Sequence, residues 1–248
     1  MTFSQNTETS DANVETKNTM EEVSVKDAIT GNTGDQTIEI KSKDTTQKAM
    51  LKLERDSHKV IYTSSYDRGL EWLLKMWSDV KKEVPGVTLE ICYGWQLFDQ
   101  FYKNNPSSMS WKARMEEMMK YEGITHHGRL PQKQLAELMK TCGIWSFPTH
   151  FGEINCISAI KAQAYGCEPV VVNYAALKET VQFGRKVEGD IYDQETQDEF
   201  KKQLIDALKN PMGEEKRQEM MKWAWDKYKW EKIAISWDEE FRKGGKNE

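Results

Sequence analysis

The segment 145–172, WSFPTHFGEINCISAIKAQAYGCEPVVV, constrains the fold more strongly than any other part of the chain. An apolar run ends at Pro148, a polar turn follows it, and a series of small residues typical of a helix ends at Gly166 before a second apolar run. This order predicts a buried strand, a turn, a helix and another buried strand, as in a parallel α/β sheet. Polar side chains and free backbone N–H groups should then meet at the carboxyl end of a strand, where open α/β sheets bind ligands.

Strand and helix patterns alternate along the rest of the chain up to residue 192. Strands are expected in KVIYTSS (59–65), VTLEICYGW (87–95), ITHHGRL (124–130) and KVEGDIY (186–192), and helices in segments 67–84, 96–106, 107–123, 131–143 and 175–181. Such alternation implies βαβ units, and therefore a parallel sheet with helices on both faces. We predict a Rossmann-like, doubly wound α/β domain.

Some details of the helices can also be predicted. Ser108 or Ser110 is the expected N-cap of the 107–123 helix, and Pro131 is expected in the first turn of the next one. Beyond residue 192 the pattern is helical in 197–210, 214–230 and 231–243. Large aromatic side chains bury much apolar area, so the tryptophans of these last helices are expected to seat them on the domain. These tryptophans are Trp223, Trp225, Trp230 and Trp237.

Residues 1–54 have a different composition, rich in Thr, Asn, Asp, Glu and Ser and without sustained periodicity. A segment of this kind cannot bury enough apolar area to offset the entropy lost on ordering. We therefore expect a disordered acidic tail at 1–54 and a single α/β domain at 55–248. Residues 1–46 carry the whole formal net charge of -5, so the remainder of the chain is charge-balanced and shows no basic face for nucleic acid.

The chain has no apolar run of the length that a membrane helix needs, and its first residues lack the apolar core of a signal peptide. A cytoplasmic location is expected.

The four cysteines stand singly, without a CxxC pair, and should be small buried hydrophobes rather than disulfide or metal ligands. Because the four histidines have no zinc spacing either, we predict no metal and no cofactor. The cysteines are Cys92, Cys142, Cys156 and Cys167.

Phosphate is the ligand that the 145–172 segment suits best. The turn before its helix should expose the unpaired amides of Asn155, Cys156 and Ile157 at a helix N-terminus, where the helix dipole also favours an anion. Arg68 follows the first strand and precedes a helix, so it can reach the same anion across the carboxyl edge of the sheet, with hydroxyls from Ser64 and Ser65. Alternatively, Arg68 is a surface arginine paired with Asp67 or Glu71.

Two more side chains of the turn are candidates for ligand contact. Glu153 can accept hydrogen bonds from ligand hydroxyls, or it can be an ordinary acidic residue near a helix start. His150, next to Thr149, can donate to a ligand or cap the loop, and we favour the loop role because its sequence neighbours offer it no partner.

These residues carry a resemblance to a known family. FGEINCISAIKAQAYGCEPVV, preceded by IYTSSYDRGLEWLL and HHGRLPQKQLAELMKTCGIWSFPT, resembles the carboxyl-terminal, donor-binding half of family 4 glycosyltransferases of the GT-B fold, over about residues 58–242. These are retaining enzymes that take a sugar from a nucleotide diphosphate. The resemblance implies that this chain is a single GT-B half-domain and that its ligand is a nucleotide sugar.

The resemblance also implies residue roles. Glu153 matches the first glutamate of a Glu-x7-Glu motif, which contacts the donor sugar, and the amides of residues 155–157 match those that hold the diphosphate. Arg68 matches a lysine that binds the donor phosphates. Gly128, with Arg129 beside it, matches the strand end near the nucleobase.

The sequence departs from the family pattern in three respects. Lys161 replaces the second glutamate of the motif, which contacts the ribose; a cation cannot accept hydroxyl hydrogens, although it can bind phosphate or pair with an acid. Thr63 stands where the family has an arginine, so one phosphate-binding charge is missing. Residues 1–54 are too few and too polar for the separate amino-terminal domain that holds the acceptor in GT-B enzymes.

We therefore expect a retaining glycosyltransferase, or its donor-binding portion, with a nucleotide sugar and an acceptor-domain polypeptide or a second copy of the chain as partners. A non-catalytic nucleotide-sugar-binding or scaffold subunit is the alternative. Other nucleotide-dependent chemistry is disfavoured, because no GxGxxG, P-loop or GxSxG motif occurs. The expected catalytic residues are Glu153, Arg68 and Lys161. The expected donor-binding residues are Ser64, Ser65, Gly128, Arg129, Thr149, His150, Asn155, Cys156 and Ile157.

Overall fold

A computed structural model of the chain describes residues 55–244. It contains a six-stranded sheet in the order β3-β2-β1-β4-β5-β6, and every neighbouring pair of strands is parallel. This is the strand order of the Rossmann fold, which confirms the predicted doubly wound α/β domain. The strands are β1 (Asp56–Tyr62), β2 (Thr88–Cys92), β3 (Ile124–Gly128), β4 (Cys142–Phe147), β5 (Glu168–Val172) and β6 (Arg185–Val187).

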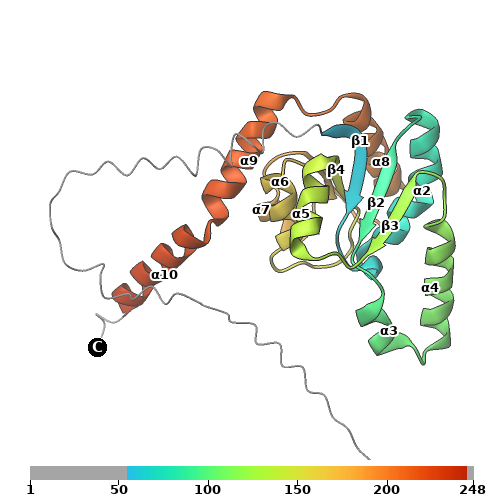
Figure 1. Cartoon of the computed structure of the whole chain (residues 1–248), viewed down its shortest axis with the longest axis horizontal. Helices are drawn as coiled ribbons and strands as arrows, with labels where there is room; N and C mark the ends of the chain where they lie inside the picture. Colours follow the sequence, from blue (N-terminus) through green and yellow to red (C-terminus); the bar gives the residue numbers. More distant parts are fainter. Residues whose placement is uncertain (1–54, 245–248) are drawn as a thin grey trace, which may run out of the picture. The chain divides into compact units, whose positions relative to one another are not determined.

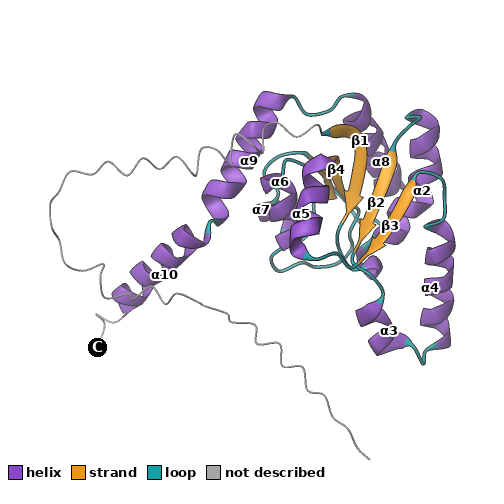
Figure 2. Cartoon of the chain, in the orientation of Figure 1, coloured by secondary structure: helices purple, strands orange, loops and turns teal. Residues whose placement is uncertain are grey.

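Helices cover both faces of the sheet (Figure 1), and the strands form one layer between them (Figure 2). Helices α2 and α8 pack together on one face, whereas α5 and α6 cover the other, where α9 packs on α6. The long helices are α2 (Leu70–Glu83), α4 (Pro106–Met118), α5 (Gln132–Thr141), α6 (Ile157–Ala164), α8 (Gln194–Lys209), α9 (Glu214–Tyr228) and α10 (Trp230–Gly244). The shorter ones are α3 (Gln96–Tyr102), α7 (Leu177–Thr180) and the 3-10 turn η2 (Tyr66–Arg68).

The core forms where the apolar patterns of the sequence meet. Every residue of β4 and β5 is buried, as expected of central strands covered on both faces. The apolar stripe of α2 turns inward, so that Leu73 and Trp77 are completely buried against the sheet. In the β1–β4 pair, Ile61 lies opposite Trp145, which brings the loops after both strands to the same place.

Three predicted boundaries are wrong in detail. Helix α4 is capped by Asn105, whose side chain accepts from the amide of Ser108 at 3.1 Å, rather than by Ser108 or Ser110. Pro106 follows this cap at the first helical position, where its missing N–H is not needed. Pro131 precedes α5 as its cap residue, one position earlier than predicted. Strand β6 contains only residues 185–187, and the rest of the predicted KVEGDIY strand is loop.

The prediction for the late tryptophans is confirmed for two of them and wrong for the other two. Trp225 donates to the carbonyl of Ala164 at 3.0 Å, and Trp223 packs against Phe183, so both attach α9 to the domain. Trp230 and Trp237, on α10, are 78% and 60% exposed.

The predicted acidic tail lies outside the described residues. Among the described helices, none combines the length and apolar character needed to cross a membrane.

Gly69 allows the turn after β1 to pack directly against the turn after β4. Its φ of +125° belongs to a region that residues with a side chain rarely adopt. A Cβ at this position would lie 2.2 Å from the carbonyl oxygen of Pro148. Only glycine therefore permits this approach, which positions the neighbouring Arg68.

Replacing Gly69 by alanine should destabilise the domain more than the same change at Gly86. Both glycines have positive φ, but a Cβ at Gly86 would meet nothing within 4 Å. We expect a loss of about 1 kcal/mol in the free energy of unfolding for Gly86→Ala, from backbone strain alone, and about 3 kcal/mol or more for Gly69→Ala. Chemical denaturation of both variants measures the difference, and equal losses would contradict the close packing at Gly69.

Candidate active site

The loops that follow β1 and β4 face each other at the carboxyl edge of the sheet. The strand order reverses between these two strands, since the chain proceeds from β1 toward β3 in one direction and from β4 toward β6 in the other. A crevice at such a switch point is the usual ligand site of an open α/β sheet. Most of the site residues predicted from the sequence belong to these two loops or to the start of α6.

Arg68 and Glu153, which are 85 residues apart in sequence, form an ion pair between these two loops. Arg68 Nη1 lies 3.1 Å from Glu153 Oε1, and the two side chains are 34% and 12% exposed. The Arg68 guanidinium also stacks on Phe151, 3.9 Å from the ring centre, which fixes its plane. The structure therefore does not pair Arg68 with Asp67 or Glu71; Glu71 instead binds Lys75 at 2.8 Å.

The start of α6 lies beside this ion pair. Helix α6 begins at Ile157 with Cys156 as its cap residue. The amide of Ile157 donates to the carbonyl of Asn155 at 3.0 Å, so one of the three amides predicted to face an anion is already used. The amides of Asn155 and Cys156 have no hydrogen-bond acceptor within the described residues. Two of the three therefore remain able to donate.

Ser158 and Thr63 join α6 to the loop after β1. Ser158 Oγ donates to the carbonyl of Thr63 at 3.2 Å, and Thr63 Oγ1 accepts from the indole of Trp145 at 3.0 Å. Thr63 thus has a structural role at the position where the family resemblance places an arginine. Sequence reasoning did not identify Ser158, because a serine near a helix start carries no specific signal.

Other predicted site residues shape the loops rather than line the crevice. Thr149 is fully buried, and its hydroxyl accepts from the amide of Phe151 at 2.9 Å, which closes a tight turn. Ser64 is buried, and the carbonyl of Ser65 accepts from the Tyr62 hydroxyl at 2.8 Å. His150 packs against Tyr192 with 5.1 Å between ring centres, and its Nδ1 is buried without a hydrogen-bond partner in the described part of the chain.

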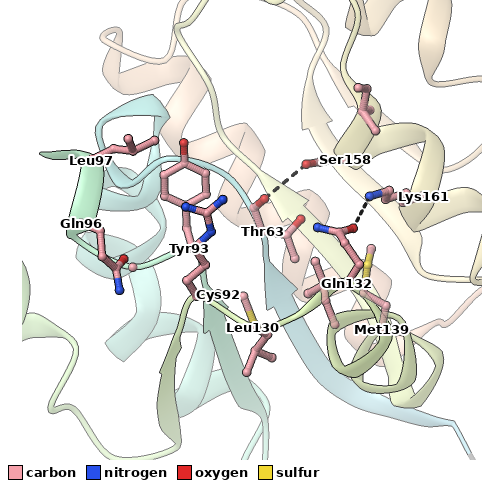
Figure 3. Close-up of a pocket in the computed structure, with 14 residues that line it drawn as sticks. Thr63, Cys92, Tyr93, Gln96, Leu97, Leu130, Gln132, Met139, Ser158 and Lys161 are labelled. Atoms are coloured by element: carbon pink, nitrogen blue, oxygen red, sulfur yellow. Dashed lines mark hydrogen bonds between the residues drawn. The ribbon is translucent and has the colours of Figure 1, made fainter. Parts of the chain in front are cut away.

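A cavity of about 230 Å³ adjoins the start of α6 on the side of α5 (Figure 3). Arg129, Ile157 and Lys161 line it, together with Tyr93, Gln96 and Gln132, which the sequence did not single out. Lys161 Nζ donates to Gln132 Oε1 at 2.5 Å, so its partner is an amide and not the acid considered from the sequence. Gly128 ends β3 next to the cavity with a φ of +65°.

The structure thus divides the predicted residues between two adjoining places. Arg68, Glu153 and the free amides of Asn155 and Cys156 lie where the loops after β1 and β4 meet, whereas Arg129 and Lys161 line the cavity. Neither Arg68 nor Glu153 lines the cavity. Helix α6 connects the two places, because its first residue, Ile157, is part of the cavity wall.

All four cysteines are free and buried, as predicted. Burial raises the pKa of the Cys156 thiol to about 11, although the amides of Ala159 and Ser158 act in the opposite direction. Burial likewise raises the pKa of Cys92 to about 12 and that of Cys167 to about 11. These thiols are therefore protonated and unreactive near neutral pH.

Cys156 should resist alkylation in the folded protein despite its place beside the crevice. With a pKa of about 11, only about 0.1% of its thiol is ionised at about pH 8, and iodoacetamide attacks the thiolate. Mass spectrometry should find Cys156 unmodified after an exposure that fully alkylates a cysteine peptide, and modified once the chain is unfolded in denaturant. Alkylation of folded Cys156 at the rate of the peptide would show that this position is not buried as described.

Comparison with known proteins assigns the chain to a family. The family model described as "Glycosyl transferases group 1" matches residues 43–225. No curated protein matches the chain. The similar solved structures include sucrose-phosphate synthase from Thermosynechococcus elongatus, at 18% identity and a TM-score of 0.60, with 82% of this chain and 49% of that chain covered.

Two further structures show the same fold at low identity. The GtfA/B complex has 13% identity and a TM-score of 0.59, with 77% of this chain and 37% of that chain covered. HepE from Anabaena, in complex with UDP and glucose, has 13% identity and a TM-score of 0.55, with 81% and 51% covered. The chain thus spans between about a third and a half of the length of these structures. With three quarters of its length matched by the family model, the chain belongs to the group 1 glycosyl transferases.

Proposed function

We propose that this chain is the donor-binding domain of a retaining family 4 glycosyltransferase and binds a nucleotide diphosphate sugar at the carboxyl edge of its sheet. The observation that carries the proposal is the meeting of Arg68 and Glu153 beside the free amides at the start of α6, next to a cavity. A cation, an acid and backbone donors therefore lie close together. A nucleotide diphosphate sugar needs this combination, because it joins a charged phosphate to a sugar rich in hydroxyl groups.

Arg68 and the start of α6 are the proposed diphosphate site. One N–H of Arg68 donates to Glu153, and the other N–H groups of the guanidinium remain for phosphate oxygens. Stacking on Phe151 holds the guanidinium in place before a ligand arrives, which lowers the cost of ordering it. The amides of Asn155 and Cys156, with the dipole of α6, add fixed positive potential. As the bond to the sugar breaks, these groups stabilise the negative charge that grows on the leaving diphosphate.

Glu153 is the proposed sugar-binding residue. Its Oε1 accepts from Arg68, and its other carboxylate oxygen can accept hydrogen bonds from sugar hydroxyls. Because the side chain is only 12% exposed, hydrogen bonds at this carboxylate form in a largely dry environment and gain strength. The ion pair with Arg68 therefore couples the sugar contact to the phosphate contact.

The cavity beside α5 is the proposed nucleoside site. Its walls combine apolar surface from Leu130 and Ile157 with the cationic side chains of Arg129 and Lys161. Lys161 already donates to Gln132, and it can donate in the same way to a ribose oxygen or a phosphate. With Arg68 and Lys161 as the counter-charges of the diphosphate, we propose that donor binding requires no metal ion.

We also propose that the chain works with a partner, which is either another polypeptide or a second copy of the chain. Helix α10 supports this, because Trp230, Trp237 and Phe241 fall on one face of the helix and are 78%, 60% and 74% exposed. An apolar helix face of this kind is a typical interaction surface.

Nucleoside diphosphates and their sugars should raise the melting temperature of the purified chain. A ligand at about a hundredfold its Kd stabilises the folded state by about 2.7 kcal/mol, and each kcal/mol raises Tm by roughly 2–4 °C in a domain of this size. In a screen of UDP, GDP, ADP and their sugars, the nucleotides of one base should clearly raise the melting temperature. Adding EDTA should leave this increase in melting temperature unchanged. If none of the nucleotides or nucleotide sugars raised the melting temperature, the proposed donor site would be contradicted.

Two variants separate the phosphate contact from the sugar contact. Arg68→Ala should abolish most of the rise with the free nucleotide, whereas Glu153→Gln should keep that rise and lose only the additional rise caused by the sugar. Each variant is compared with its own unliganded Tm, because removing Arg68 leaves the Glu153 carboxylate unpaired. Arg242→Ala is the matched control, since Arg242 is exposed on α10 and pairs with Asp238 at 2.8 Å, away from the crevice.

A further inference from the structure

A second hollow lies on the other side of the Arg68 turn, on the face of the sheet that carries α2. It has a volume of about 500 Å³, within the range of roughly 300–1,000 Å³ typical of sites for small ligands. Its walls come from η2, the start of α2, helices α3 and α4, and the loops that contain His150 and Tyr192. No residue is shared with the proposed nucleoside cavity, so this groove is a separate feature of the molecule.

Aromatic rings in fixed orientations dominate the walls of the groove. Tyr192 is 59% exposed, yet its ring is held by the edge of Trp72, 5.4 Å away at 87°, and by His150 at 5.1 Å. On another wall, Tyr102 packs on Phe98 with 4.9 Å between ring centres. Exposed rings that are already immobilised lose little entropy when a ligand stacks on them, which makes them favourable binding platforms.

The groove also presents one acidic and one basic group that are free to bind. Asp67 and Arg114 both line it, and neither forms an ion pair with another of the described residues. Glu71, by contrast, is committed: its Oε2 accepts from the indole of Trp111 at 2.7 Å, and Lys75 holds its other oxygen. The free groups are thus a hydrogen-bond acceptor and a hydrogen-bond donor of opposite charge, flanked by aromatic surface.

We propose that this groove binds a pyranose ring of a neutral saccharide. The C–H groups on one face of such a ring pack on the electron-rich faces of Tyr192 and Tyr102. Its hydroxyl groups donate to Asp67 and accept from Arg114. An acidic or phosphorylated sugar could pair with Arg114 but would bring its charge against the carboxylate of Asp67, and a purely apolar ligand would leave Asp67 and Arg114 desolvated without partners.

The position of the groove fits an acceptor. Asp67 directly precedes Arg68, and His150 directly precedes Phe151, on which Arg68 stacks, so the two sites share the walls formed by these loops. A saccharide in the groove would therefore lie next to the proposed donor sugar. This role as acceptor rests on the proposed glycosyl transfer, whereas saccharide binding by itself does not.

The test is binding of the purified full chain to an array of neutral and acidic oligosaccharides, followed by titration of the methyl glycosides of the bound sugars by saturation-transfer NMR. Neutral glycans should bind. Tyr192→Ala should weaken binding at least tenfold, Tyr192→Phe should retain it, and Asp67→Asn should weaken it. Tyr121→Ala is the matched control, because this 46% exposed tyrosine precedes β3 at the opposite edge of the sheet and lies outside the groove.

Absence of binding across the array, binding of acidic glycans only, or equal binding by Tyr192→Ala would overturn the assignment. The melting-temperature rise with nucleotides is measured on the same variants and should be unchanged in Tyr192→Ala. If saccharides bind and nucleotides do not, the proposed donor function fails and the groove remains. If nucleotides bind and saccharides do not, the groove is wrong and the donor site stands.

Discussion

The parallel pairing of β1 with β4 is the constraint on which the candidate site depends. It brings the carboxyl ends of two central strands together, and the glycine at position 69 lets the following turns touch. Arg68 and Glu153 can meet only because both turns occupy this place. The fold thus creates the site through backbone geometry, and the side chains then give it charge. A loss of packing at Gly69 would separate the ion pair although no charged residue had changed.

The cavity beside α5 and the groove on the α2 side lie on opposite sides of the turn that contains Arg68, and they differ in chemistry. The one beside α5 carries the cations Arg129 and Lys161, which suits an anionic nucleotide. The other carries aromatic rings with Asp67 and Arg114, which suits a neutral, hydroxyl-rich ligand. The Arg68–Glu153 pair belongs to the turns between them, and under the proposed function it would connect a phosphate contact to a sugar contact. This arrangement would place a donor and a saccharide in adjoining sites of one domain.

Much of the fold could be predicted from the sequence because periodicity reports burial directly. The central strands and the amphipathic α2 produce strong patterns, and they were located correctly. Cap residues were less predictable: Asn105 outcompeted two serines because Pro106 can follow a cap but cannot lie deep within a helix. The exposure of Trp230 and Trp237 could not be predicted either, since amphipathic helices have the same pattern whether their apolar face is covered or open.

The candidate site was only partly accessible from the sequence. Arg68 and Glu153 could be identified because they lie in turns next to predicted strand ends. Their pairing depends on distance in space, and so do the cavity contributions of Tyr93 and Gln132. Thr149 was an expected ligand contact, but a threonine in a tight turn can serve its own backbone instead, and its hydroxyl does so. Short polar side chains are ambiguous in this way wherever loops are compact.

The most direct test of the central claim is a crystal structure of the chain with the nucleoside diphosphate that stabilises it best. Our account predicts the diphosphate within hydrogen-bonding distance of the Arg68 guanidinium and the amides of Asn155 and Cys156, with the base in the cavity beside Arg129. A diphosphate bound elsewhere, with these amides and the Arg68–Glu153 pair untouched by ligand, would contradict it.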